Sequence, residues 1–262
     1  HIYKYKRFQD VRLVFAPESA IASFGGDPDN FNFPRYGLDV SFLRVYENDK
    51  PATVEQFFSW AKASVAVDEL TFIIGNPGRT DRLLTLAELT FHRDVLLPER
   101  LMKLAEYRGF ITEFQKRGPE QARISSDSLD FAENAFKALR GRHQTLTDAA
   151  FFEQKRQEEA DLKAKIAADP AKQAKYGPAF DAITKTLETQ KALRYSISYI
   201  SGGAGFDSQL FDYARTLVRA ANELPKPNAE RLPEFADARL PALKAKILKE
   251  APVYEELEIA EL

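Results

Sequence analysis

The sequence predicts an α+β protein in which a β-rich segment is followed by a longer, all-helical segment. Between residue 10 and about residue 75, apolar residues alternate with polar ones or form short runs closed by turn residues, as is typical of strands. From about Thr80 onward, apolar residues recur three and four positions apart, which is the spacing of amphipathic helices. No stretch repeats at a fixed period, so a solenoid is not expected.

The composition describes an ordinary globular protein. With 262 residues, of which 44% are hydrophobic and 29% charged, the chain can bury a core in one or two domains. The 37 basic and 39 acidic residues leave a charge of −2, so we expect no nucleic-acid partner. No apolar run approaches the ~18 residues of a membrane span. The lack of cysteine excludes disulfides, thiolate zinc sites and a cysteine nucleophile.

Three strands are expected in the β-rich segment. Residues 11–15 alternate with period two, and residues 38–46 form a second strand with Asp39 as its first inward position. Asn48-Asp49-Lys50-Pro51 is a strong turn signal. Residues 70–74 form a third strand that ends at Gly75-Asn76-Pro77-Gly78.

The helical segment is predicted from stripes of apolar residues separated by proline and glycine breaks. Pro98 fits the first turn of a helix, and residues 151–168 carry mixed charges typical of an exposed helix. Breaks are expected at Asp169-Pro170 and at Tyr176-Gly177-Pro178, and Ser201 to Gly205 is expected to be a loop. The stripes are Leu86, Leu89, Leu97, Leu101, Leu104 and Ala105; Leu129, Ala132, Phe136 and Leu139; Leu210, Ala214, Leu217, Val218 and Ala221; and Leu240, Leu243 and Ile247.

The loop before the second strand combines turn residues with polar and aromatic side chains. It runs from Gly25 to Gly37 and leads into Asp39-Val40-Ser41-Phe42-Leu43-Arg44-Val45. A similar strand opening occurs in trypsin-type double barrels, where the aspartate accepts a hydrogen bond from the catalytic histidine. A purely structural role for Asp39 is the alternative.

Taken together, three motifs resemble the bacterial serine dipeptidyl-peptidases of the type-seven and type-eleven kind. The motifs are Asp10 to Pro17; Gly25-Gly26-Asp27-Pro28-Asp29-Asn30 with the aromatic pair around Asn32, Pro34-Arg35 and the Asp39 strand; and Arg79-Thr80-Asp81-Arg82-Leu83-Leu84. The segment before the last motif, Phe72 to Gly78, resembles the strand and turn that open the second barrel of trypsin-type peptidases. The resemblance implies a chymotrypsin-like double β-barrel with an inserted helical cap. Residues 1–85 would then be part of the barrel, and residues 86–262 a cap that is incomplete at its end.

The resemblance also implies roles for individual residues. Asp39 would be the triad aspartate, and Asn30, Phe31 and Arg35 would help to hold the free amino terminus of a peptide substrate. Family members often have tryptophan where this chain has Phe31. Asn134 would be the asparagine that the helical cap contributes to the same amine. It lies about 140° from Leu129 around the helix, off the apolar stripe, which agrees equally with simple solvent exposure.

Two members of a serine triad are missing from these residues. Only His1 precedes Asp39, and no Gly-Asp/Asn-Ser-Gly run supplies a nucleophile. Ser201-Gly202-Gly203 follows Tyr199 and Ile200, so we interpret it as a loop between helices. We therefore expect a central fragment of a longer peptidase. The resemblance implies that the whole protein is an exported, periplasmic or secreted dipeptidyl aminopeptidase and a homodimer. The fragment itself should be inactive, because it lacks the histidine, the serine and the oxyanion hole.

No metal or cofactor is expected. Asp27-x-Asp29 begins like a calcium loop, but Phe31 and Leu38 occupy positions that must carry ligands. His92-x-Asp94 has no third ligand nearby. Two other functions stay open: a non-catalytic helical interaction module descended from such a peptidase, and a trypsin-type endopeptidase.

Overall fold

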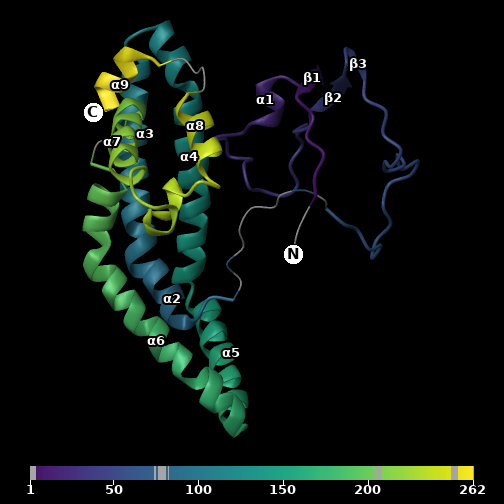
Figure 1. Ribbon diagram of the computed structural model, residues 1–262. Coiled ribbons are helices and arrows are strands. Elements are labelled where there is room, and N and C mark those ends of the chain that lie inside the picture. The colour runs from purple at the N-terminus through teal and green to yellow at the C-terminus, as the bar shows by residue number, and fades with distance from the viewer. Residues whose placement is uncertain are drawn as a thin grey trace. The chain divides into compact units, whose positions relative to one another are not determined.

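A computed structural model describes residues 4–73, 75, 81, 83–202, 204–205, 208–248 and 253–261. The chain divides into two compact units, His1–Leu83 and Leu84–Leu262, which are described separately. The first contains a small antiparallel sheet and the second is helical (Figure 1). The predicted α+β class is therefore confirmed. His1, Ile74, residues 76–80, Arg82 and Gly203, which belong to the motifs above, lie outside the described residues.

The sheet of the first unit has the strand order β1-β2-β3, with β1 at Asp10–Phe15, β2 at Phe42–Glu47 and β3 at Lys50–Pro51. The short helix α1, Ser19–Ala22, follows β1. The predicted turn after β2 is confirmed, because Asn48 and Asp49 adopt φ values of 52° and 61°. Asparagine and aspartate tolerate this left-handed conformation, which suits a two-residue hairpin.

Two strand predictions are wrong: one strand begins later than expected, and the other is not formed by the described residues. The second strand begins at Phe42, because β1 ends at Phe15, which pairs with Phe42. Just upstream, the Leu38 N–H donates to the Ile21 carbonyl of α1 at 2.9 Å, so this segment is tied to a helix and not to the sheet. Residues 70–73 form no strand among the described residues, and their apolar side chains are exposed. A strand needs a neighbour to pair its backbone groups, and no described segment pairs with this one.

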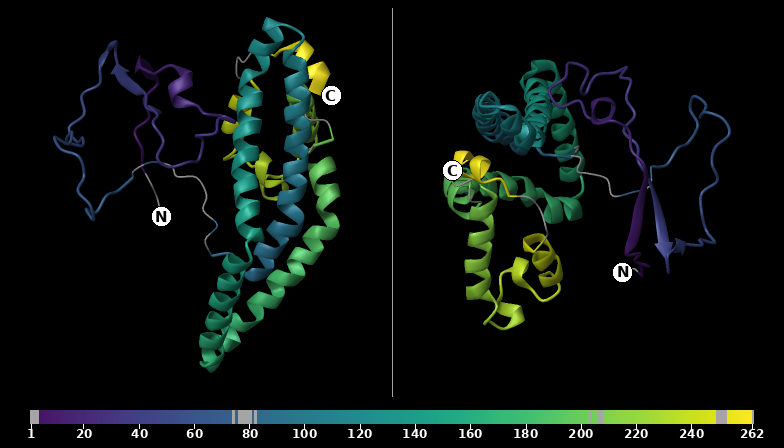
Figure 2. Two further views of the ribbon diagram at one scale, coloured as in Figure 1. Left: turned by 180° about the vertical axis from the view of Figure 1, so that it is seen from behind. Right: turned by 90° about the horizontal axis from the view of Figure 1, so that it is seen from above.

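The helices of the second unit follow the predicted order closely. They are α2 (Leu86–Phe91), η1 (His92–Leu96), α3 (Leu97–Gln115), α4 (Pro119–Thr147), α5 (Ala149–Ala167), α6 (Pro170–Tyr195), η2 (Ser196–Ser201), α7 (Gln209–Glu223), η3 (Asn228–Glu230), η4 (Pro233–Phe235), α8 (Leu240–Ile247) and α9 (Glu255–Glu261). Segments η1 and η2 are π-helical turns, and η3 and η4 are 3₁₀ turns. Figures 1 and 2 show α3 beside α4, and α5 beside α6.

Capping side chains explain where several helices begin. Thr85 and Glu88 form a capping box at the start of α2. Asp148, Asp169 and Ser208 accept hydrogen bonds from the first backbone N–H groups of α5, α6 and α7. Pro98 lies in the first turn of α3, as predicted, where a missing N–H costs least.

The predicted break at Tyr176-Gly177-Pro178 is wrong, because α6 continues through Pro178. Proline removes one helical hydrogen bond. The packing of this long helix against α5 and α2 offsets that loss. No described helix is long and apolar enough to span a membrane.

Two apolar clusters form the core of the second unit. Leu89, Leu97, Leu146 and Phe152 join α2, α3, α4 and α5. Ile111, Phe114 and Leu257 join α3 to α9, with Ile124 and Leu129 of α4 packed against them. The predicted inner face of α7 is wrong in this respect, because Leu210, Leu217 and Val218 are exposed. No described segment covers them.

Candidate functional site

The loop between α1 and β2 is built by short-range hydrogen bonds. Backbone N–H groups of Asp27, Asn30 and Asn32 each donate to the carbonyl three residues before, at 2.6–3.1 Å. The Asp27 carboxylate also accepts from the Asp29 N–H at 2.8 Å. The loop begins at Gly25, which is buried and has φ of 44°, a conformation that favours glycine. The loop therefore holds its shape largely through its own residues.

Asn30 is the buried polar side chain of this loop, with 4% of its surface exposed. Its Nδ2 donates to the Gly25 carbonyl at 2.6 Å, and its Oδ1 accepts from Arg35 Nη1 at 3.3 Å. An amide has distinct donor and acceptor ends. These two contacts therefore define which end faces Gly25 and which faces Arg35.

Arg35 and Phe31 lie on the exposed side of the loop. The Arg35 guanidinium lies over the Phe24 ring, 4.4 Å from its centroid, which is cation–π geometry. Phe31 has φ of 63°, and 58% of its surface is exposed. A bulky residue in this left-handed region is strained, and such strain often marks functional positions. Sequence reasoning did not anticipate this backbone conformation.

Asp39 lies three residues before β2 and is exposed. The expectation that it occupies the first inward strand position is therefore wrong. The reason is the same as for the late start of β2: residues 38–41 have no sheet neighbour in the described part of the chain. The structure brings Asn30 and Arg35 into contact, but no contact joins either of them to Asp39 among the interactions described.

Asn134 belongs to the second unit, near the middle of α4. It is half-buried, whereas Ala132 on the same helix is fully buried and Phe131 is 70% exposed. At about 100° per residue, Asn134 lies on the side of Phe131 and away from Ala132. This agrees with the predicted position off the apolar stripe.

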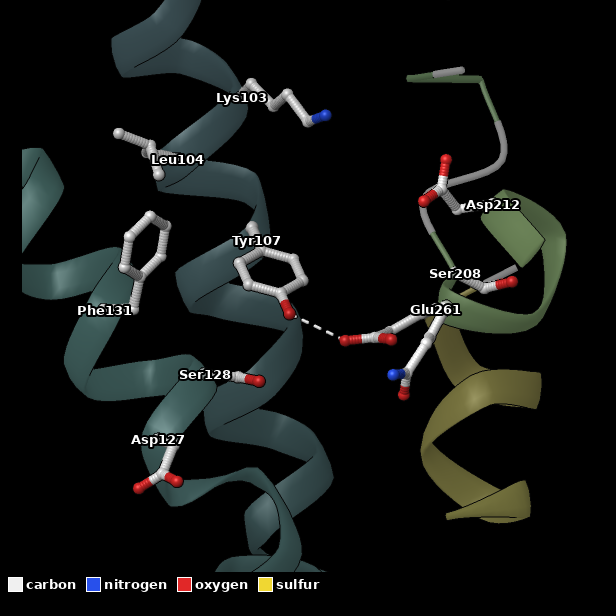
Figure 3. A pocket seen from close by; sticks show the side chains of 10 residues that line it. Lys103, Leu104, Tyr107, Asp127, Ser128, Phe131, Ser208, Asp212 and Glu261 are labelled. Atoms are coloured by element: carbon white, nitrogen blue, oxygen red, sulfur yellow. Dashed lines mark hydrogen bonds between the residues drawn. The ribbon is translucent and has the colours of Figure 1, made fainter. Parts of the chain in front are cut away.

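A pocket of about 710 Å³ lies in the second unit, between α3 and α4 on one side and the start of α7 and the end of α9 on the other (Figure 3). Tyr107 Oη donates to Glu261 Oε1 at 2.7 Å, which links α3 to α9 across it. Asp212 also lines it, and hydrogen bonds from Lys246 and then Arg215 lower the pKa of this carboxyl. The described lining contains two serines but no histidine, so it offers no serine–histidine pair. Sequence reasoning missed this pocket, since its residues come from four helices.

The polar residues considered as metal ligands or as a nucleophile, Asp94 and Ser201, make contacts within the second unit. The Asp94 carboxylate accepts two hydrogen bonds from Arg93, at 2.6 and 2.9 Å, which lower the pKa of Asp94. Among the described residues, no group of three or more His, Asp or Glu side chains is placed to hold a metal ion. Ser201 ends the π-helical turn η2, and its carbonyl accepts from Arg215.

Comparison with known proteins gives one family. The model of the Peptidase S46 family matches residues 1–262. An Asp/Glu-specific dipeptidyl-peptidase of Shewanella putrefaciens is 26% identical over 245 residues, which is 88% of this chain and 32% of that protein. Dipeptidyl-peptidase 7 of Porphyromonas endodontalis is 30% identical over 268 residues, covering 95% of this chain and 32% of that protein. The chain thus spans about a third of the length of these relatives.

Proposed function

The chain belongs to the Peptidase S46 family, and on this basis we propose that the protein containing it removes dipeptides from the free amino terminus of peptides. The observation that carries the proposal is the family match over all 262 residues. Relatives that match most of the chain are named as dipeptidyl-peptidases, which supports an exopeptidase over an endopeptidase.

In this proposal Asp39 is the aspartate of a serine triad. It would accept a hydrogen bond from the Nδ1–H of a histidine and stabilise the imidazolium formed when a serine attacks the scissile carbonyl. The histidine and serine would come from other parts of a longer protein with a chymotrypsin-like double barrel. Residues 1–85 would be part of that barrel, and residues 86–262 part of its helical cap.

Asn30, Phe31, Arg35 and Asn134 would recognise the substrate amine. An ammonium group carries three donors and needs acceptors, which amide oxygens supply. Because a guanidinium repels an ammonium, Arg35 would act through Asn30, whose oxygen it orients. The exposed ring of Phe31 would offer an aromatic face to the cation. Binding the amine at a fixed distance from the serine would make a dipeptide the product.

The protein would act on oligopeptides in the periplasm or outside the cell, as a homodimer. Neither a metal nor a cofactor enters the proposed reaction, since the triad and the oxyanion hole supply the chemistry.

The test uses the full-length protein and fluorogenic dipeptidyl substrates with a free or an acetylated amino terminus. We expect cleavage of the free form only. Asn30→Ala should raise KM for that form by roughly 10-fold or more, because a hydrogen bond to a charged group contributes about 1.5–3 kcal/mol. Asn32→Ala, an exposed asparagine of the same loop, is the matched control and should stay close to wild type.

Equal cleavage of the acetylated substrate would contradict the exopeptidase proposal and favour the endopeptidase. Absence of any peptidase activity in the full-length protein would favour the non-catalytic module.

A further inference from the structure

The Phe24 ring is connected to the amide of Asn30 through the side chain of Arg35. Arg35 connects the two, since its guanidinium lies 4.4 Å from the Phe24 centroid and its Nη1 donates to Asn30 Oδ1 at 3.3 Å. Phe24 is half-buried, whereas Arg35 is exposed. The ring is therefore the more constrained of the two groups and can act as a platform for the guanidinium.

The backbone around Phe24 is also held in place. The Phe24 carbonyl accepts from the Asp27 N–H at 2.6 Å, and the next residue, Gly25, accepts from Asn30 Nδ2. Phe24 and Gly25 thus hold both ends of the Asn30 amide: the backbone of Gly25 holds the nitrogen directly, and the ring of Phe24 holds the oxygen through Arg35.

Gly37 leaves space for the ring. A Cβ atom at this position would lie 3.1 Å from both Cε2 and Cζ of Phe24 and 3.4 Å from the Ile21 carbonyl oxygen. The φ of Gly37 does not itself require glycine. A side chain here would therefore require the Phe24 ring to shift by a few tenths of an ångström.

We propose that Phe24 is a positioning residue for substrate-amine binding: its ring, accommodated by Gly37, holds Arg35 so that Asn30 presents its oxygen to the ammonium group. This inference rests on the proposed function. Phe24 would affect substrate affinity, and therefore KM, without affecting the groups that react.

The test is a double-mutant cycle in the full-length protein, with steady-state kinetics on a free-amine dipeptidyl substrate. Phe24→Leu keeps an apolar side chain without the ring, and we expect KM to rise about two- to five-fold, the range for an exposed cation–π contact, with kcat within two-fold of wild type. Arg35→Lys should raise KM at least as much, because lysine lacks the planar group that stacks and bonds in a fixed direction. Gly37→Ala should resemble Phe24→Leu.

The decisive measurement is the double variant Phe24→Leu/Arg35→Lys. If Phe24 acts through Arg35, its KM equals that of Arg35→Lys alone. A KM that is the product of the two single effects assigns Phe24 a merely structural role and overturns the inference. Tyr36→Leu removes another aromatic ring of this loop, 93% exposed, and should leave KM within two-fold.

Thermal unfolding of each variant checks that it folds, and Phe24→Met replaces Phe24→Leu if the latter does not. An unchanged KM in Phe24→Leu would refute the positioning role while the dipeptidyl activity stands. A wild-type protein without dipeptidyl activity would refute the proposed function instead, so the two failures are distinguishable.

Discussion

The packing of α3 against α4 and α9 leads to a quantitative prediction at Ile111. This side chain is fully buried, in the cluster that it forms with Phe114 and Leu257. Replacing it with alanine removes three heavy atoms, and such a change in a core costs about 2–5 kcal/mol, the transfer free energy plus the cavity left behind. Replacing it with valine removes one methylene and should cost about 0.5–1.5 kcal/mol.

The assay is urea unfolding of the 262-residue chain, followed by far-UV circular dichroism, whose signal comes mainly from the helices of the second unit. The urea midpoint should be highest for wild type, lower for Ile111→Val and lowest for Ile111→Ala, with little change in the denaturant slope m. Met102→Ala, on the same helix but 63% exposed, is the control and should lie within about 0.5 kcal/mol of wild type. A loss below about 1 kcal/mol in Ile111→Ala would refute the α3–α4–α9 packing.

Three further predictions follow. Asp39→Asn in the full-length protein should lower kcat by roughly 10⁴-fold, as removal of a triad carboxylate does, with little change in KM. Hydrogen bonds from Lys226 and the Leu232 N–H hold the pKa of Glu223 below its ordinary value of 4.5. The ionised carboxylate therefore stabilises the fold above pH 4.5, and this stability is lost as the pH falls through the folded-state pKa. In Glu223→Gln, the urea midpoint should therefore fall less in acid than in wild type. Pro178→Ala should restore a helical hydrogen bond and raise the free energy of unfolding by up to about 3 kcal/mol, seen as a higher urea midpoint.

The sequence predicted the helical unit well because its signals are local. The spacing of apolar residues reports one helix at a time, and the predicted break at Asp169-Pro170 coincides with the start of α6. The break at Pro178 failed because packing against other helices offset a local preference. The pocket around Tyr107 was not predictable, since its members meet only when four helices pack.

The first predicted strand, residues 11–15, is confirmed by β1, whereas the second and third predictions failed for the opposite reason. A strand requires a partner that is distant in sequence, and the alternation of residues 38–46 contains no information on where that partner ends. Pairing of Phe42 with Phe15 sets the start of β2, and the Leu38–Ile21 hydrogen bond takes the preceding segment away from the sheet. The predicted position of Asp39 followed from the alternation alone and was wrong with it.

The same distinction separates the two parts of the candidate site. Asn30 is held by Gly25 and Arg35, each five residues away, so these contacts form within one loop. Asp39 can perform triad chemistry only beside a histidine that is buried with it, and burial of an exposed carboxylate needs strands distant in sequence. In the proposed function, the part of amine recognition that Asn30 supplies is thus a local property of this loop, and Asn134 of α4 would add to it. Catalysis, in the proposed function, is a property of the assembled barrel. Variants at Asn30 and Arg35 should accordingly change KM, whereas variants that disturb the pairing of β2, which follows Asp39, should change kcat.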